Sequence, residues 1–204
     1  MILTLSKPAR ITAGVISLSA LAALAVQCTL NLERDGSPLV AAALLMRFFT
    51  IWANLAAALL FGWVALKGRT HFGIPFALAT ALAIVAVVYW VLLSADHHPV
   101  GWDRYTNQMH HTIVPALSVL WWAAFTTPAD GGWRSIPLVT IFPLTYTAFA
   151  LVYGEVSGFY PYFFIDVPQF GMVQVALNLV GLAIAFMLFG ALLLALRRLV
   201  SPRA

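Results

Sequence analysis

The sequence predicts an all-α integral membrane protein, built as a single bundle of six transmembrane helices with both termini in the cytoplasm. Of its 204 residues, 62% are hydrophobic and 9% are charged, and the mean hydropathy is +0.93, which excludes an ordinary soluble globule. Six apolar segments are long enough to cross about 30 Å of hydrocarbon as helices. The basic residues also gather in alternate connections, as a fixed membrane orientation requires.

The predicted spans follow one another closely. Their connections are short, so there is no soluble domain, and residues 1–204 should form one domain. The first span follows KPAR like a signal peptide, but its length favours an uncleaved helix. The six spans lie near 11–31, 38–66, 72–94, 109–126, 136–156 and 172–196.

The orientation follows from the basic residues, because positively charged segments stay on the cytoplasmic side. Eight of the eleven Lys and Arg residues lie at the termini or in the second and fourth loops: Lys7, Arg10, Lys67, Arg69, Arg134, Arg197, Arg198 and Arg203. We therefore expect a multi-pass protein of the cell (inner) membrane, with the lipid bilayer as its surroundings. No concentrated basic face exists, which argues against nucleic acid as a partner.

The second span contains an ionisable side chain, which is expensive in hydrocarbon and needs a partner, a cavity or a function. Arg47, Thr50 and Asn54 follow the spacing i, i+3 and i+7, which predicts one polar stripe on one helix face. Arg47 can snorkel, pair with a carboxylate or hold a substrate carboxylate. Thr50 can bond back to its own helix or act as a buried hydroxyl.

The fourth predicted span opens with adjacent histidines in the stretch NQMHHTIVP. With α-helical spacing, His111 shares a face with Pro115 and Ser118, whereas His110 points about 100° away. A neutral imidazole accepts a proton near pH 7 and can activate a nearby hydroxyl. The alternative is that the histidines only cap the helix at the interface.

The outer end of the fifth span carries the stretch YGEVSGFYPYFFIDV. Glu155 is the natural buried counter-ion for Arg47, because both should lie in the outer half of the bilayer. Tyr160 and Tyr162 flank a proline at the expected interface, where aromatic rings are favoured. They either form an aromatic belt or line a substrate site.

Three separated motifs, RFFTIWANL, HHTIVPALSVLWW and SGFYPYFFIDV, together resemble a bacterial branch of the androgen-induced-protein superfamily, over about residues 40 to 190. Animal members are multi-span hydrolases that cleave fatty acid esters of hydroxy fatty acids with an intramembrane threonine and a histidine. The resemblance implies Thr50 as the nucleophile and His111 or His110 as the base. We prefer His111, four residues before Pro115.

These residues predict an intramembrane esterase in which His111 takes the Thr50 proton and the alkoxide attacks a lipid ester. Asn54 or a tyrosine would donate to the oxyanion, and no metal or organic cofactor is needed. The substrate would be a membrane lipid or fatty-acyl ester. A small transporter or a lipid-binding module without catalysis is the main alternative. A haem carrier is disfavoured, because His71 is the only histidine outside the 97–111 region.

Overall fold

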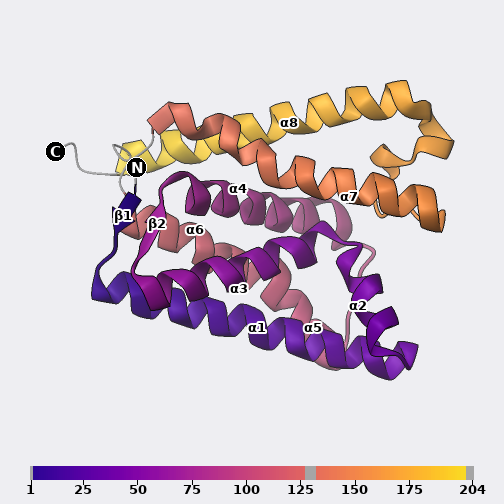
Figure 1. Cartoon of the computed structure of the whole chain (residues 1–204), viewed down its shortest axis with the longest axis horizontal. Helices are drawn as coiled ribbons and strands as arrows, with labels where there is room; N and C mark the ends of the chain where they lie inside the picture. Colours follow the sequence, from indigo (N-terminus) through magenta and orange to yellow (C-terminus); the bar gives the residue numbers. More distant parts are fainter. Residues whose placement is uncertain (1, 127–131, 201–204) are drawn as a thin grey trace.

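The computed structural model describes residues 2–126 and 132–200, which form a bundle of helices aligned along one long axis (Figure 1). Its elements are β1 (Ile2–Thr4), α1 (Lys7–Asp35), α2 (Pro38–Met46), α3 (Phe49–Lys67), β2 (Arg69–His71), α4 (Gly73–Val88), η1 (Tyr89–Leu93), α5 (Gly101–Gln108), η2 (Met109–Ile113), α6 (Val114–Phe125), η4 (Gly132–Thr140), α7 (Ile141–Ser157), η5 (Phe163–Ile165) and α8 (Val167–Val200). The turns η1 and η2 are π-helical, and η4 and η5 are 3-10 helices.

The prediction of a largely helical chain with long apolar helices is confirmed, and it fits a multi-pass membrane protein. Within residues 2–126 and 132–200, five helices are long and apolar enough to cross a membrane: Lys7–Asp35, Phe49–Lys67, Gly73–Leu93, Gly132–Ser157 and Val167–Leu199. The span predicted near 109–126 overlaps the helical stretch 101–125, and this stretch is not one of these five. A sixth crossing and the cytoplasmic location of both termini therefore stay predictions.

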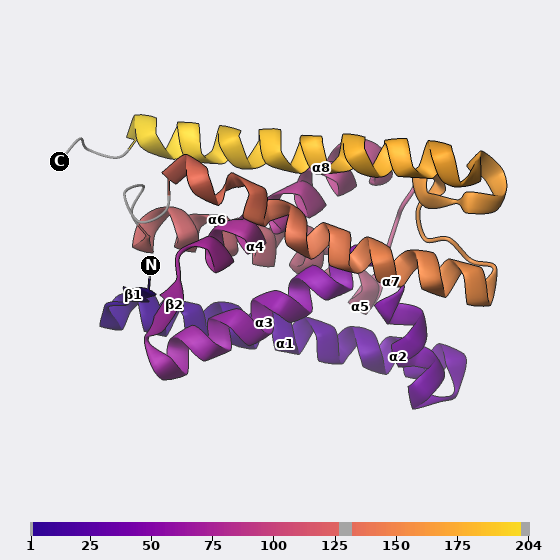
Figure 2. The ribbon, with the colours of Figure 1, turned by 45° about the horizontal axis from the view of Figure 1, so that its top comes forward.

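The two ends of the bundle differ. At one end β1 pairs antiparallel with β2, a short sheet that the helical prediction missed. The C-terminal part of α8 reaches the same end, whereas α2 and the α7–α8 connection lie at the opposite end (Figures 1 and 2). We call these the strand end and the α2 end. The basic segment around Arg69 thus lies at the same end as the last turn of α8.

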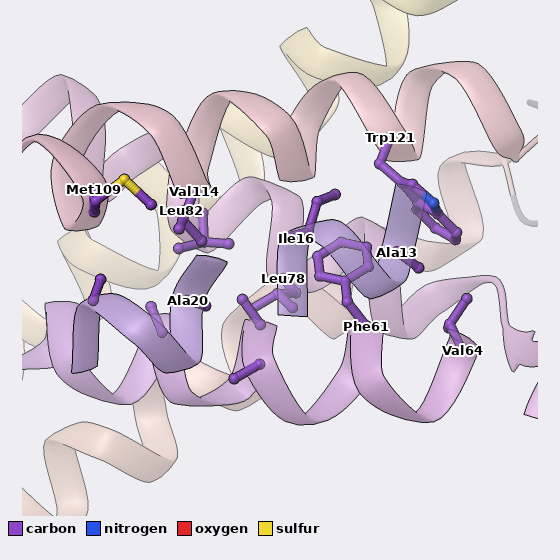
Figure 3. Packing of buried hydrophobic residues seen from close by; sticks show 14 of the residues in the cluster. Ala13, Ile16, Ala20, Phe61, Val64, Leu78, Leu82, Met109, Val114 and Trp121 are labelled. Atoms are coloured by element: carbon purple, nitrogen blue, oxygen red, sulfur yellow. The ribbon is translucent and has the colours of Figure 1, made fainter. Parts of the chain in front are cut away.

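The helices α1 and α3 pack closely because small residues line their contact (Figure 3). Ala13 and Ala20 on α1 and Ala57 on α3 are fully buried. The Ser17 hydroxyl crosses the contact and donates to the Ala58 carbonyl at 2.7 Å. This packing fixes α3 against α1 and leaves the first turn of α3 facing the other helices.

The second predicted span is not one helix, which corrects the expected 38–66 segment. It breaks between α2 and α3, where Phe48 adopts an extended conformation. Three side chains satisfy carbonyls at the break: Arg47 Nε donates to Leu44, Trp52 Nε1 to Met46, and the Tyr146 hydroxyl to Arg47. The break places Thr50 in the first turn of α3.

Two consequences follow from this break. Arg47 lies before it, so the predicted stripe of Arg47, Thr50 and Asn54 on one helix face is wrong. Only Thr50 and Asn54 share a helix, and the Asn54 amide donates to the Thr50 carbonyl at 2.9 Å. The positive end of the α3 dipole also lies beside Thr50.

The two histidines lie in the π-helical turn η2. The angle between their side chains that α-helical spacing predicts therefore does not apply to them. The Val114 N–H reaches back five residues to the Met109 carbonyl. In this pattern the donor for the His110 carbonyl would come from Pro115, which has no N–H. The Asn54 amide supplies the missing donor at 3.1 Å. Asn54 therefore ties α3 to η2.

Candidate active site

The structure brings together Thr50 and His111, 61 residues apart in the sequence. The Thr50 Oγ1 lies 3.4 Å from His111 Nε2. This is longer than an ideal hydrogen bond, but catalytic hydrogen bonds are often long before substrate binds. Both side chains are half-buried, so the pair is shielded yet open to a ligand.

The hydrogen bond at the other ring nitrogen fixes the tautomer of His111. Its Nδ1 lies 3.1 Å from the Asn107 carbonyl, which can only accept, so Nδ1 carries the proton. Nε2 is then an acceptor and faces the Thr50 hydroxyl. This is the arrangement that lets an imidazole remove the proton of a nucleophile.

The ring of Tyr89 packs against the face of the His111 ring. The two rings stack with centroids 4.0 Å apart. The Tyr89 hydroxyl accepts from the Asn107 side chain at 2.7 Å and lies 3.2 Å from His97 Nδ1. Sequence reasoning missed both Tyr89 and Asn107, although the i, i+4 spacing of Asn107 and His111 placed them one helical turn apart.

His110 has a different environment from its neighbour. It is 3% exposed, and neither of its ring nitrogens has a hydrogen-bond partner among the described residues. Its backbone carbonyl accepts a hydrogen bond from Asn54 of α3. The structure thus brings His111, rather than His110, to Thr50.

Both hydrogens of the Asn54 side-chain amide are already donated within the protein, which corrects its expected role as an oxyanion donor. Its Nδ2 donates to the Thr50 and His110 carbonyls. An amide nitrogen has two hydrogens, so neither is left for a substrate. Asn54 joins the first turn of α3, which carries Thr50, to the histidine-bearing turn η2.

Arg47 and Glu155 do not form the expected salt bridge. The Arg47 guanidinium lies over the rings of Phe48 and Phe159, 5.5 Å and 4.3 Å from their centroids. Glu155 is exposed on α7. The cation–π contacts satisfy Arg47 without a carboxylate, which sequence spacing alone did not reveal.

The two tyrosines of the YPY stretch lie in different surroundings. Tyr160 packs on Gly154 of α7, where any Cβ would meet its ring, and it lines neither of the cavities described below. Tyr162 reaches the start of α3, where its hydroxyl accepts the Phe49 N–H at 3.2 Å, and it lines both of those cavities together with Thr50. Burial raises the pKa of the Tyr162 phenol above its ordinary value, so the group stays protonated at neutral pH.

Two cavities meet at the Thr50–His111 pair. One, of about 250 Å³, is lined almost entirely by apolar side chains from α4, η1, α7, η5 and α8. The other, of about 850 Å³, has a mixed wall, in which apolar side chains alternate with polar and charged residues of α1, α5 and the 94–100 connection. Both include Thr50, Tyr89, Leu93, His111 and Tyr162 in their walls. The pair thus lies between an apolar cavity and a larger cavity whose wall also carries polar and charged groups.

Comparison of the chain with family models, curated proteins and solved structures found no match to any of them. The resemblance to the androgen-induced-protein superfamily therefore rests on its three sequence motifs alone.

Proposed function

We propose that the protein is an intramembrane hydrolase of lipid esters, with Thr50 as nucleophile and His111 as general base. The observation that carries the proposal is the 3.4 Å approach of Thr50 Oγ1 to the unprotonated Nε2 of His111, in the wall shared by an apolar cavity and a larger cavity that also carries polar groups. A lipid ester has the matching chemistry, because its carbonyl separates an acyl chain from a polar part.

The first half of the reaction forms an acyl-threonine. His111 Nε2 accepts the Thr50 proton as the Thr50 oxygen bonds to the ester carbonyl carbon. The tetrahedral intermediate collapses by breaking the bond to the leaving alcohol, which takes the proton from His111. In the second half, water loses a proton to His111 and attacks the acyl-threonine, releasing the fatty acid and restoring the Thr50 hydroxyl.

Two donors can stabilise the oxyanion. The Thr50 N–H lies in the first turn of α3 and has no intrahelical acceptor there. Tyr162 lines both cavities and keeps its own proton available to a substrate while it accepts from Phe49. A backbone N–H and a second donor aimed at the developing charge match the usual design of an oxyanion hole.

The apolar cavity supports a substrate that enters from the membrane. Two residues of its wall, Leu92 and Phe163, are 67% and 73% exposed. Exposed apolar side chains at a cavity mouth suit lipid rather than water as the surroundings. An acyl chain can therefore enter from the side and place its ester at Thr50.

The test is hydrolysis of a long-chain lipid ester by purified variants. Thr50→Val keeps the side-chain shape and should lower kcat by about a thousandfold or more, whereas Thr50→Ser should retain part of the activity. His111→Ala should be as inactive as Thr50→Val, and the double variant no worse, because the two groups act as one unit. Thr12→Val is the matched control, since the Thr12 hydroxyl bonds only within α1.

Two outcomes would redirect the proposal. Full activity in Thr50→Val would exclude the threonine nucleophile and leave the cavities as the lipid-binding site of a transporter or binding protein. An inactive His110→Ala alongside a fully active His111→Ala would transfer the general base to His110.

A further inference from the structure

We propose that the strand end of the bundle binds the headgroup of an anionic phospholipid. The binding surface is formed by four exposed basic side chains from α1, α3 and β2: Lys7, Arg10, Lys67 and Arg69. We call these four the basic corner. It lies at the opposite end of α3 from Thr50, so the inference goes beyond the hydrolase proposal and does not depend on it.

Contacts between α1, α3 and β2 hold the basic corner together. Arg10 reaches from α1 to the last turn of α3, where its Nε and Nη2 donate to the carbonyls of Ala65 and Leu66, each at 3.1 Å. The register of the short sheet places Thr4, just before α1, opposite Arg69. The Arg10 guanidinium has five N–H groups and donates two of them here, so three remain for phosphate oxygens.

The charged residues of the protein are separated along its long axis. The described carboxylates lie in the last turns of α1 and α7, in the stretch 94–108 and in the α7–α8 connection, all toward the α2 end (Figures 1 and 2): Glu33, Asp35, Asp96, Asp103, Glu155 and Asp166. Asp130 falls outside the described residues. No carboxylate within residues 2–126 and 132–200 therefore neutralises the basic corner, and an anion from outside the chain is its natural partner.

Trp63 indicates the depth of the basic corner in the membrane. Its Nε1 donates to the Arg69 carbonyl at 3.1 Å, and Lys67 Nζ lies 5.8 Å from its ring centroid. Tryptophan is favoured at the level of the lipid headgroups. Leu59 and Leu66 share this face of α3 at i, i+4 and i+7 spacing and are 65% and 76% exposed. An acyl chain can lie along this face while its phosphate reaches the corner.

Net charge favours an anionic phospholipid over a zwitterionic one. Both kinds of lipid carry a phosphate that Lys and Arg can bind. A zwitterionic headgroup adds an ammonium, which the four cations of the basic corner repel. The predicted orientation also places the strand end at the cytoplasmic leaflet, where anionic lipids attract basic residues. Phosphatidylglycerol has the required chemistry.

The experiment is a titration of the wild-type protein, in neutral detergent, with phosphatidylglycerol and with phosphatidylcholine of identical acyl chains. Native mass spectrometry counts the bound lipids and gives each Kd. We expect phosphatidylglycerol to bind about tenfold more tightly, because several cations attract it together. Inorganic phosphate at the same concentration should not displace it, since phosphate alone lacks acyl chains to bury. Equal Kd values for the two lipids, or displacement by inorganic phosphate, would overturn the proposal.

A matched pair of variants locates the site. Arg69→Gln removes one cation from the basic corner and should weaken phosphatidylglycerol binding about fivefold, with little change for phosphatidylcholine. Arg104→Gln makes the same substitution at an exposed arginine of α5, toward the α2 end, and should leave both Kd values unchanged. Lys67→Gln should weaken binding as Arg69→Gln does, and thermal unfolding checks that each variant is folded. The inference is wrong if phosphatidylglycerol binds both corner variants like the wild type, or if Arg104→Gln weakens binding equally.

Discussion

Asn54 is the connection between the two halves of the candidate active site, and Asn54→Leu removes it at nearly constant volume. The side chain is fully buried and donates to the carbonyls of Thr50 and His110. In the variant, the Thr50 carbonyl keeps its helical N–H donor, but the His110 carbonyl loses its donor, because Pro115 cannot supply one. We therefore expect η2 to shift relative to α3.

The size of the effect follows from these contacts. Each lost hydrogen bond is worth about 1 kcal/mol net, and a carbonyl left unpaired costs about 1–3 kcal/mol. Leucine also removes the unpaired Asn54 Oδ1, which offsets part of the loss. A net loss of about 1–2 kcal/mol should lower Tm by about 2–8 °C for a chain of this size. The kcat should fall more than about tenfold, since misplacing reacting groups by about 1 Å can cost about 100-fold.

Thermal unfolding in detergent and ester hydrolysis measure the two effects. Ser118→Ala is the control, because Ser118 is also fully buried but its hydroxyl bonds only to the Val114 carbonyl of its own helix. It should retain kcat and nearly all of the Tm. If Asn54→Leu melts and turns over like the wild type, Asn54 does not hold the site together.

Three further predictions concern the contacts around the site and the orientation in the membrane. Arg47→Met and Glu155→Gln should have additive effects on the free energy of unfolding, to within about 0.5 kcal/mol, because the residues form no ion pair; a double variant that recovers stability would show that they do. Tyr162→Phe should lower kcat about 100-fold with little change in KM if its hydroxyl donates to the oxyanion, and an unchanged kcat would exclude that role. Cysteines placed at Arg69 and Val100, in a background without the native cysteine, should be labelled by an impermeant reagent from opposite sides of the membrane, and labelling of both from one side would contradict the predicted orientation.

The lengths of the apolar segments predicted most of the fold, since five long apolar helices in the described residues lie where five of the six apolar segments were expected. It failed at the start of α3, because the stretch LLMRFFTI contains neither Gly nor Pro to mark a break. The break is instead stabilised by donors distant in sequence, such as Tyr146. The π-helical turn η2 had a signal in Pro115, but periodicity arguments assume α-helical spacing and overlook it.

In the candidate site, too, the sequence predicted some features and missed others. Thr50 and His111 were identified from their residue types and motifs, and the structure places them in contact. The roles of Asn54 and Arg47 depended on which neighbours reach their polar atoms, which spacing cannot show. Tyr89 was missed because an aromatic residue in an apolar run has no distinguishing pattern, and only tertiary structure stacks it on His111.

The most direct test of the central claim is to map the residue that reacts with a long-chain fluorophosphonate, using mass spectrometry of peptides from the purified protein. A nucleophile activated by His111 should place the adduct on Thr50, and labelling should disappear in both Thr50→Val and His111→Ala. An unmodified Thr50 in the wild-type protein, or undiminished labelling of Thr50 in His111→Ala, would contradict the proposed pair.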